Sequence, residues 1–422
     1  MIQTNRISFW RVGVAASVAL VCGSASAADW PQYRGPERSG TVGQDGLRDH
    51  WAEGQPSVVW RQSIGTGYSA VSVVGDRLYT MDADDEQEHV LCLDADTGET
   101  VWRLDAGPFV QAELGDGGPR STPTVAGGVV YAISYQARVM ALDATDGSLI
   151  WDKDLTDLGP VPRFGYAISP LVDGDLVLIE LGKKEEGPGV AALDRKTGEI
   201  RWSALNGPTG YSSAIIAEIA GIRQYVIFRA IGREVVGLST GGEVLWQWPA
   251  EGALSAIPMP IFLPPDRLFV STSEDAFGGV MLRISESHGT FSVDEVWSER
   301  LMRNHFNTSV LVNGHLYGFD NGTFRCLDAE TGERRWAKRG FGKGSLIAAG
   351  ELLYVLSDGG LVALVHATGE KYKEAGRLQV MEGRSWTAPS LANGRLYLRD
   401  FDEIVSVDVG NGSEGVGKEG AP

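Results

Sequence analysis

A pattern of eleven residues recurs along this chain and ends each time in tryptophan. A small residue comes first, Asp follows two residues later, Gly six later and Trp ten later. The clearest copies are CLDADTGETVW (92–102), ALDATDGSLIW (141–151), ALDRKTGEIRW (192–202) and CLDAETGERRW (326–336). Degraded copies end at Trp246 and Trp297, and a related stretch ends at Trp60. The tryptophans thus recur about every 46 residues, a spacing typical of propeller blades.

The pattern has a physical interpretation as a strand, a turn and a second strand. The small residue, a large apolar one and Asp end the first strand, with alternate side chains on opposite faces. The Asp side chain can accept backbone N–H bonds across the turn, and Gly supplies a positive φ there. The Trp lies on the returning strand, where it can cover a large apolar area of a neighbouring unit. Two strands cannot bury that ring alone, so each unit requires neighbours.

A second hairpin precedes each copy. Its strands are apolar and its turn is Gly-Gly, Asp-Gly or Asn-Gly, which are strong hairpin signals. Examples are STPTVAGGVVYAI (121–133), SPLVDGDLVLIE (169–180), TSVLVNGHLYGF (308–319) and APSLANGRLYLR (388–399). Each unit is therefore predicted to contain two hairpins, or four antiparallel strands.

The last unit lacks its fourth strand. It contains APSLANGRLYLR and SVDVGNG (406–412) but no Trp. The strand around Trp60 has no unit of its own, so we predict that residues 57–63 pair with residues 402–408 and close the ring. Closure removes the exposed sheet edges that invite aggregation. The predicted fold is all-β: an eight-bladed β-propeller of four-stranded antiparallel blades, closed by the N-terminal strand.

Four regions are expected. Residues 1–27 read as a cleaved secretory signal: Arg6 and Arg11 are the only charges, an apolar run follows, and Ala25-Ser26-Ala27 fits a cleavage site. Residues 28–56 form an N-terminal extension packed on the ring, 57–412 the propeller, and 413–422 a flexible tail. The expected location is periplasmic or secreted. The alternative is lipoprotein anchoring at Cys22, which Val21 disfavours because a lipobox needs a small residue there.

Charge and cysteine content narrow the possible partners. The formal net charge of −18 argues against binding to nucleic acid or anionic lipid. No segment after the leader is suited to crossing a membrane, and a monomer is expected. Cys92 and Cys326 occupy the same small-residue slot in non-adjacent units, so we predict two buried free thiols rather than a disulfide.

The repeated pattern resembles the tryptophan-docking motif of PQQ-like β-propellers. That family includes quinoprotein dehydrogenases and outer-membrane protein assembly factors of the BamB type, and the resemblance covers residues 57 to 412. The opening DWPQYRGPERSG (29–40) is similar to the start of secreted bacterial PQQ-like repeat proteins. Repeats of this kind are specific for the fold and not for an activity.

The members of this family differ in whether they are enzymes. Quinoprotein dehydrogenases of this family are generally longer and carry adjacent cysteines, a Ca²⁺ site and an Asp base. This chain contains no Cys-Cys pair and no C-x-x-C-H haem motif. The length, the eight units and the leader are more similar to the assembly factor. No cofactor is therefore expected, PQQ with calcium is the alternative, and a non-enzymatic role is favoured although the question stays open.

Other catalytic signatures are missing from the sequence. None of the six histidines lies within metal-ligand spacing of another His or a Cys, so they are interpreted as surface or turn residues. No G-x-S-x-G elbow, P-loop or H-E-x-x-H motif occurs. The run DADDE (82–86) lacks the Gly and distal Glu of an EF-hand loop and is read as a solvated loop.

One set of residues suggests a binding surface. Alignment of the repeats places an aromatic or Arg residue just before the innermost strand of most blades, where a channel would open. These candidate funnel-mouth residues are Tyr68, Arg120, Arg163, Tyr166, Tyr211, Phe306 and Trp386, with Phe164 beside them. Aromatic faces and an Arg suit stacking on a ring, a sugar or an extended peptide. The same side chains could equally fill the channel to close it.

Three functions follow from these observations. The first is a periplasmic scaffold that binds a protein or peptide partner of the cell envelope, as in outer-membrane protein assembly. The second is a PQQ- and Ca²⁺-dependent oxidoreductase of alcohols or sugars, and the third is a carbohydrate-binding propeller. A cluster of carboxylates and amides around a stacked Trp would favour the second, and such carboxylates are not evident near Trp386 in the sequence.

Overall fold

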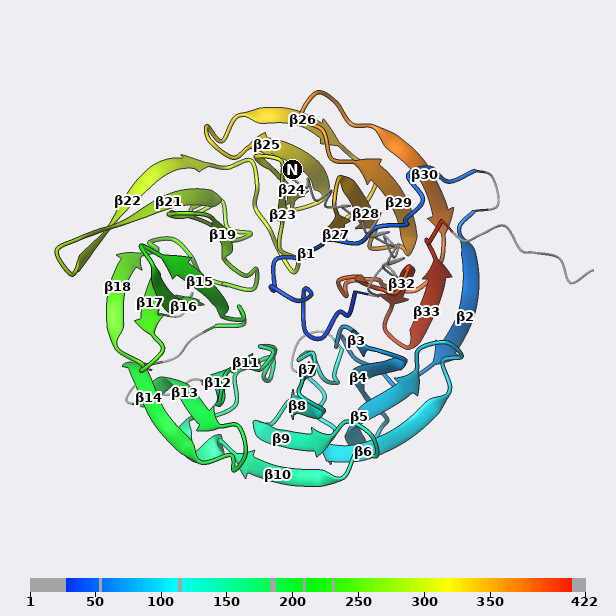
Figure 1. Cartoon of the computed structure of the whole chain (residues 1–422), viewed down its shortest axis with the longest axis horizontal. Coiled ribbons are helices and arrows are strands. Elements are labelled where there is room, and N and C mark those ends of the chain that lie inside the picture. Colours follow the sequence, from blue (N-terminus) through cyan, green and yellow to red (C-terminus); the bar gives the residue numbers. More distant parts are fainter. Residues whose placement is uncertain are drawn as a thin grey trace, which may run out of the picture.

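Sheets arranged in a ring make up the protein (Figure 1). The computed structural model describes residues 28–52, 55–112, 116–182, 187–207, 210–229 and 232–411, so the predicted signal (1–27) and tail (413–422) lie outside the described residues. Within the described residues, strands form eight sheets, each with four antiparallel strands, and one sheet gains a fifth, parallel strand. No helix in this part of the chain is both long and apolar enough to span a bilayer. The predicted all-β, eight-bladed propeller is confirmed.

The first four blades follow one another in chain order, and each begins with a short strand near the axis. Blade 1 is β3 (Ser72–Val74), β4 (Arg77–Ala83), β5 (Gln87–Asp94) and β6 (Thr100–Pro108); blade 2 is β7 (Thr124–Ala126), β8 (Val129–Ile133), β9 (Arg138–Asp143) and β10 (Leu149–Asp154). A short 3₁₀ helix, η1 (Thr156–Leu158), leads to blade 3, which is β11 (Leu171–Asp173), β12 (Leu176–Glu180), β13 (Pro188–Asp194) and β14 (Ile200–Asn206). Blade 4 is β15 (Ile215–Ile219), β16 (Ile222–Arg229), β17 (Glu234–Ser239) and β18 (Val244–Pro249).

The remaining blades repeat this plan. Blade 5 is β19 (Ile261–Leu263), β20 (Arg267–Ser271), β21 (Gly279–Ser287) and β22 (Thr290–Glu299); blade 6 is β23 (Val310–Val312), β24 (His315–Asp320), β25 (Thr323–Asp328) and β26 (Arg334–Lys338). Blade 7 is β27 (Ser345–Ala349), β28 (Leu352–Leu356), β29 (Leu361–His366) and β30 (Glu374–Gln379), extended by β1 (Thr41–Val42). Blade 8 is β31 (Ser390–Ala392), β32 (Arg395–Arg399) and β33 (Glu403–Asp408), completed by β2 (Ser57–Ser63).

The N-terminal strand closes the ring as predicted. β2 pairs antiparallel with β33, from Ser57 opposite Asp408 to Ser63 opposite Glu403. In Figure 1 the blue β2 lies beside the red β33, although the two strands are more than 300 residues apart in the chain. The first and last strands of the propeller therefore share one sheet, and β33 has no free edge.

The repeated pattern works locally as its chemistry suggests. Asp94 Oδ1 accepts hydrogen bonds from the backbone N–H of Asp96 and of Thr97, both at 3.0 Å, and equivalent bonds are made by Asp143, Asp194 and Asp328. The small residue faces the Trp across the hairpin, because Cys92 lies opposite Trp102 in the pairing register. A larger side chain in that slot would compete with the indole for the same space.

Each of these indoles packs on the following blade. The Gly of the next repeat lies directly over the indole ring, so a Cβ at Gly198, where φ is +72°, would meet Trp151 at 2.6 Å. The indole Nε1–H of Trp151 donates to the carbonyl of Arg195 at 3.0 Å. The same pair of contacts joins Trp60 to Gly98 and Ala95, Trp102 to Gly147 and Ala144, and Trp297 to Gly332 and Ala329. One repeat of the sequence pattern therefore corresponds to one blade.

Trp202 departs from this arrangement. It is half-buried, whereas Trp151 is 8% exposed, and its Nε1 has no hydrogen-bond partner among the described residues. Its ring still packs on Gly242. The repeat that receives it is the copy that is one residue short, with Ser239 where other copies have Asp. We attribute the missing bond to this shortened turn, which changes the position of the carbonyl that other copies offer.

The N-terminal extension lies across the axis of the ring (Figure 1). Trp30 and Val73 exchange two backbone hydrogen bonds of 2.8 Å, which attach the extension to blade 1. The Arg34 guanidinium donates to the carbonyl of Ser309 in blade 6 at 2.7 Å, and that of Arg38 donates to Ser169 before blade 3 at 2.8 Å. Both arginines are buried. The extension thus joins inner strands from opposite sides of the ring.

Cys92 and Cys326 are buried free thiols, in agreement with the prediction. Burial raises the pKa of each thiol to about 12, so neither forms a thiolate at neutral pH. They therefore serve as small apolar residues opposite Trp102 and Trp336.

Candidate binding site on the mouth face

The inner strands of the blades all begin at the same face of the ring, which we call the mouth face. The inner strands, which surround the axis (Figure 1), are β3, β7, β11, β15, β19, β23, β27 and β31. Contacts join β3 to β31 and β7, β7 to β11, and β23 to β19 and β27. Hydroxyl groups connect the segments that precede them. The N–H of Ala70 donates to Thr122 Oγ1, that of Thr122 to Ser169 Oγ and that of Ser169 to Ser213 Oγ, each at 3.0 Å. These hydrogen bonds fix the backbone segments that carry the predicted site residues.

Three of the predicted residues form one aromatic group. Tyr68 before blade 1 stacks on Trp386 before blade 8, with ring centroids 6.1 Å apart and planes 20° from parallel. Phe306 before blade 6 contacts the other side of the group, 4.6 Å from Trp386. His305 and Phe401 extend it, at 3.9 Å from Phe306 and 5.4 Å from Tyr68. Residues more than 300 positions apart in the chain therefore meet on the mouth face.

Two further predicted residues form a second group. Tyr211 before blade 4 lies edge-on to Phe164, with centroids 5.8 Å apart, and its hydroxyl oxygen accepts the Phe164 N–H at 3.4 Å. The Arg163 guanidinium lies 5.6 Å from the Phe164 ring. Tyr135 donates its hydroxyl to the Arg163 carbonyl at 3.2 Å. This group continues the aromatic surface over blades 2, 3 and 4.

Arg120 lies between the two groups. Its guanidinium is 5.1 Å from the Tyr68 ring, and its charge also acts on Tyr135 and Tyr211. Nη2 donates to the backbone carbonyl of Asp116 at 3.0 Å, whereas Nη1 has no hydrogen-bond partner among the described residues. Burial lowers the pKa of Arg120 below its usual value. A buried guanidinium N–H without an acceptor is a position at which a ligand oxygen would be stabilised.

Tyr166 does not belong to this site. It is 2% exposed and lies in the hydrophobic core between blades 2 and 3, where its hydroxyl oxygen accepts the N–H of Gly182 at 2.9 Å. The alignment of the repeats left it one position out of step with Tyr68 and Tyr211. That one-residue offset turns the side chain into the core rather than toward the mouth face.

The structure also adds residues that the repeats did not indicate. The Arg384 guanidinium lies 4.7 Å from the Trp386 ring, and Lys343 Nζ lies 5.5 Å from the Phe306 ring. Asp116 accepts a hydrogen bond from the Tyr68 hydroxyl at 2.9 Å and forms an ion pair with Arg384. These three residues lie on connecting loops that have no counterpart in the repeated pattern. We call Tyr68, Arg120, Arg163, Tyr211, Phe306, Lys343, Arg384 and Trp386 the mouth cluster.

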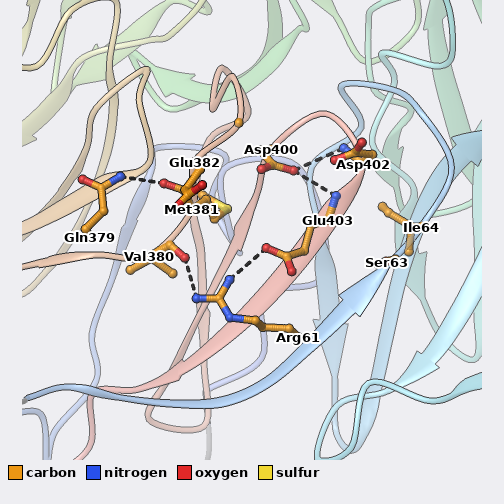
Figure 2. A pocket seen from close by; sticks show the side chains of 11 residues that line it. Arg61, Ser63, Ile64, Gln379, Val380, Met381, Glu382, Asp400, Asp402 and Glu403 are labelled. Carbon is orange, nitrogen blue, oxygen red and sulfur yellow. Dashed lines mark hydrogen bonds and ion pairs between the residues drawn. The ribbon is translucent and has the colours of Figure 1, made fainter.

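A cleft of about 570 Å³ opens beside the mouth cluster, between blades 7 and 8 (Figure 2). Arg61 spans it, donating to Glu403 at 2.9 Å and to the Val380 carbonyl at 2.6 Å. Asp400 accepts the backbone N–H groups of Asp402 and Glu403. The wall that holds Gly383 continues into Arg384, so the cleft and the mouth cluster share one loop. The carboxylates of Asp400 and Glu403 are engaged by these internal bonds.

Acidic and basic side chains gather around His89 in blade 1. His89 is buried, contrary to its interpretation as a surface residue, and its Nδ1 lies 3.2 Å from Asp82 Oδ1. Asp82 itself is a buried residue of β4 and not part of a solvated loop. Arg103 occupies the same cluster, with Nη2 at 2.6 Å from His89 Nδ1. In the described ranges no group of three or more His, Cys, Asp or Glu side chains has an arrangement that could hold a metal ion.

A buried carboxyl behind the mouth face predicts how stability depends on pH. Burial raises the pKa of Glu180 from its usual 4.5 to about 8, against the opposing influence of the Ala214 N–H and the charges of Arg38 and Arg229. The folded chain therefore retains a proton that the unfolded chain loses, so the free energy of unfolding falls as pH rises between these two pKa values. We expect the melting temperature of the protein to fall from about pH 5 to pH 9, and that of Glu180→Gln to fall less.

Thermal melts of both proteins across this pH range measure the difference. Exposed Glu218 on β15 provides the matched control, because Glu218→Gln removes a carboxylate without removing a buried one. Identical pH profiles for the parent and Glu180→Gln would rule out this titration.

Comparison with known proteins places this geometry in a family. The family model described as outer membrane protein assembly factor BamB matches residues 52–221 and 231–418. The BamB protein of Yersinia pestis is 25% identical over 370 residues, which cover 82% of this chain and 77% of the relative.

Solved structures show the same fold. The structure of BamB from Moraxella catarrhalis superposes with a TM-score of 0.60 at 14% identity, over 84% of this chain and 99% of that one. A europium-containing methanol dehydrogenase superposes with a TM-score of 0.65 at 14% identity, over 88% of this chain and 89% of that one. At 14% identity the superpositions establish the fold alone. The family model, by contrast, is matched by most of the sequence. The chain therefore belongs to the family described as outer membrane protein assembly factor BamB.

Proposed function

We propose that this protein is a non-enzymatic scaffold that binds a protein or peptide partner through the mouth cluster. The observation that carries the proposal is the convergence of aromatic and cationic side chains from blades 1, 2, 3, 4, 6, 7 and 8 on one face. Binding energy at protein interfaces is concentrated in a few Trp, Tyr and Arg side chains. Most members of the cluster are half-buried, so they are held in place before a partner arrives.

The cellular setting follows from the family. Its model and the Yersinia relative both carry the description outer membrane protein assembly factor. We therefore propose that residues 1–27 direct export, that the mature chain works as a monomer in the periplasm, and that its partners belong to outer-membrane protein assembly. We further propose that the indole contacts between blades act as tryptophan docking, which keeps the loops of the mouth face in register.

The residues present do not fit PQQ with calcium. The Trp386 ring has neighbours on several sides, with Tyr68 at 6.1 Å, Phe306 at 4.6 Å and the Arg384 guanidinium at 4.7 Å. Calcium needs six to eight oxygen ligands. Asp116 is the carboxylate that contacts this ring system, and it is engaged by Arg384 and Tyr68. Among the described residues, no group of three or more His, Cys, Asp or Glu side chains could hold a metal ion. This donor set supports the scaffold over the oxidoreductase.

Changing Tyr68, Arg120 and Trp386 together to Ala should weaken partner binding and leave the ring folded. These side chains lie before the inner strands, outside the indole contacts that hold the blades together. Hot-spot side chains contribute about 2 kcal/mol or more each, so the triple variant should lose at least about a hundredfold in affinity. The measurement is capture from an envelope extract with immobilised protein, followed by titration of each captured protein after purification.

The control variant replaces Val101, Ile150 and Val244 by Ala. These exposed apolar residues lie on the outer strands β6, β10 and β18, away from the mouth face. It should bind every partner as the parent does. The proposal fails if the mouth variant, shown to be folded by circular dichroism, retains all partners with parent affinity.

A further inference from the structure

Asp116 places a carboxylate of this chain among the cations of the mouth cluster. The Tyr68 hydroxyl donates to Asp116 Oδ2 at 2.9 Å, and Arg384 Nη1 contacts both that oxygen and, at 3.2 Å, the Tyr68 hydroxyl. The side chains of Asp116 and Arg384 are 40% and 45% exposed. Solvent therefore reaches this ion pair, and an exposed pair contributes little to stability, about 0–1 kcal/mol. Its carboxylate can be exchanged for another at low cost.

The surrounding charge is positive on a chain that is strongly negative. Arg163, Lys343 and Arg384 are exposed on the mouth cluster, and Arg120 lies beneath them with a free Nη1. The Asp116 carboxylate acts on Arg120, and the Glu274 carboxylate acts on His305. His305 adds no charge at neutral pH, because burial, together with the nearby charge of Lys343, lowers its pKa to about 4. Four cations thus gather here while the whole chain carries a formal charge of −18.

We propose that the mouth cluster recognises an acidic segment of the partner protein, whose carboxylate takes the place of Asp116 between Arg384 and the Tyr68 hydroxyl. This inference rests on the proposed function and names the chemistry of its partner. A second carboxylate of the segment would reach Nη1 of Arg120, which has no hydrogen-bond partner among the described residues and whose guanidinium lies 5.1 Å from the Tyr68 ring. Guanidinium groups bind carboxylates through strong charge-assisted hydrogen bonds.

The net negative charge does not prevent this recognition. Charges more than about 8 Å apart are screened at physiological ionic strength, so a bound carboxylate responds mainly to the cations beside it. The negative remainder of the surface does have an effect on specificity. An acidic segment is attracted where these cations lie and is repelled by the acidic parts of the surface, which favours this site over them.

The test uses two blocked heptapeptides and calorimetric titration. One has the sequence GDFDFEG, and its uncharged twin is GNFNFQG, which has nearly the same shape. The parent protein should bind the acidic peptide about tenfold more tightly than its twin at low ionic strength, as expected for a charge-assisted contact. Added NaCl should weaken binding of the acidic peptide and leave the twin unaffected.

Two variants should change the affinity in opposite directions. Arg384→Gln should weaken binding of the acidic peptide about tenfold, because it removes the cation that holds the carboxylate. Asp116→Asn should strengthen binding by about threefold or more, because it removes the competing carboxylate. The matched controls are Asp402→Asn, an exposed carboxylate on the same face, and Arg283→Gln, an exposed cation on β21. Both controls should bind like the parent.

Each outcome decides between recognition and a structural role. Equal affinity of the parent for the two peptides, or no response to NaCl, would overturn the inference without the use of any variant. Weaker binding by Asp116→Asn, to the same extent as by Arg384→Gln, would make Asp116 a structural support and also overturn it. The proposed function is judged separately. If the Tyr68, Arg120 and Trp386 variant loses partner capture, the scaffold proposal stands, even if the parent binds the two peptides with equal affinity.

Discussion

Replacing Trp151 by Ala is expected to lower the free energy of unfolding by about 3–5 kcal/mol, as for other buried large-to-small changes. Its indole is 8% exposed, covers Gly198 of the next blade and donates to the Arg195 carbonyl at 3.0 Å. Removal of the ring leaves a cavity between blades 2 and 3 and an acceptor without its donor. Urea unfolding followed by fluorescence measures the loss.

The chain supplies its own comparison for this change. Trp202→Ala removes the same ring from the equivalent position, where it is half-buried and its Nε1 has no partner among the described residues. It should therefore cost clearly less than Trp151→Ala. Trp151→Phe should fall between, because it keeps one aromatic ring but loses the second ring of the indole and the N–H donor. The lost hydrogen bond alone is worth about 1 kcal/mol. Equal losses at Trp151 and Trp202 would contradict the account of how blades are joined.

Deleting the mature chain up to Ile64 is expected to cause aggregation. The deletion removes β2, and β33 then presents an unpaired edge of backbone N–H and C=O groups, which is a template for pairing between chains. Light scattering and gel filtration of the purified protein measure the outcome. A monomeric product that melts like the parent would show that the ring does not depend on this strand.

A shorter deletion separates the strand from the extension. Removing residues 28–52 takes away Arg34 and Arg38, which join blades 6 and 3 across the axis, and keeps β2 on β33. This protein should melt at a lower temperature than the parent and remain monomeric. The contrast between the two deletions then assigns the aggregation to the open edge of β33.

The fold could be predicted because the interaction that builds it is periodic. Blades 1, 2 and 3 repeat the Asp turn, the small residue opposite Trp and the packing of that Trp on the Gly of the next repeat, so one local contact specifies both the blade and its neighbour. The closing strand followed from counting strands, because one unit lacked its fourth strand and Trp60 had no unit. The missing hydrogen-bond partner of Trp202 Nε1 among the described residues could also have been anticipated from the sequence, since the repeat that receives it is one residue short.

The site was predicted only in part because it depends on loops. Tyr68, Arg120, Tyr211, Phe306 and Trp386 were found because each precedes an inner strand and inherits its position from the repeat. The assignment of Tyr166 to the mouth face was wrong, because a shift of one residue along the chain turns the side chain into the core.

Asp116, Lys343 and Arg384 lie on connecting loops of irregular length. No periodicity carries their positions, and their contacts join blades that are distant in sequence. The same holds for Arg34 and Arg38, whose partners in the blades lie 131 to 275 positions away. Such contacts follow from the closed ring and cannot be read from any local stretch.

The central claim is that the mouth face binds a partner protein in the cell envelope. Site-specific photo-crosslinking in living cells tests it most directly, with p-benzoylphenylalanine placed at Tyr211 of the mouth cluster or at Val244, which is 49% exposed on the outer strand β18. Irradiation should attach a second protein to the chain from Tyr211, and the Tyr68, Arg120 and Trp386 variant should abolish that product. A product formed from Val244 and not from Tyr211 would contradict the claim and place the partner on the outer rim of the ring.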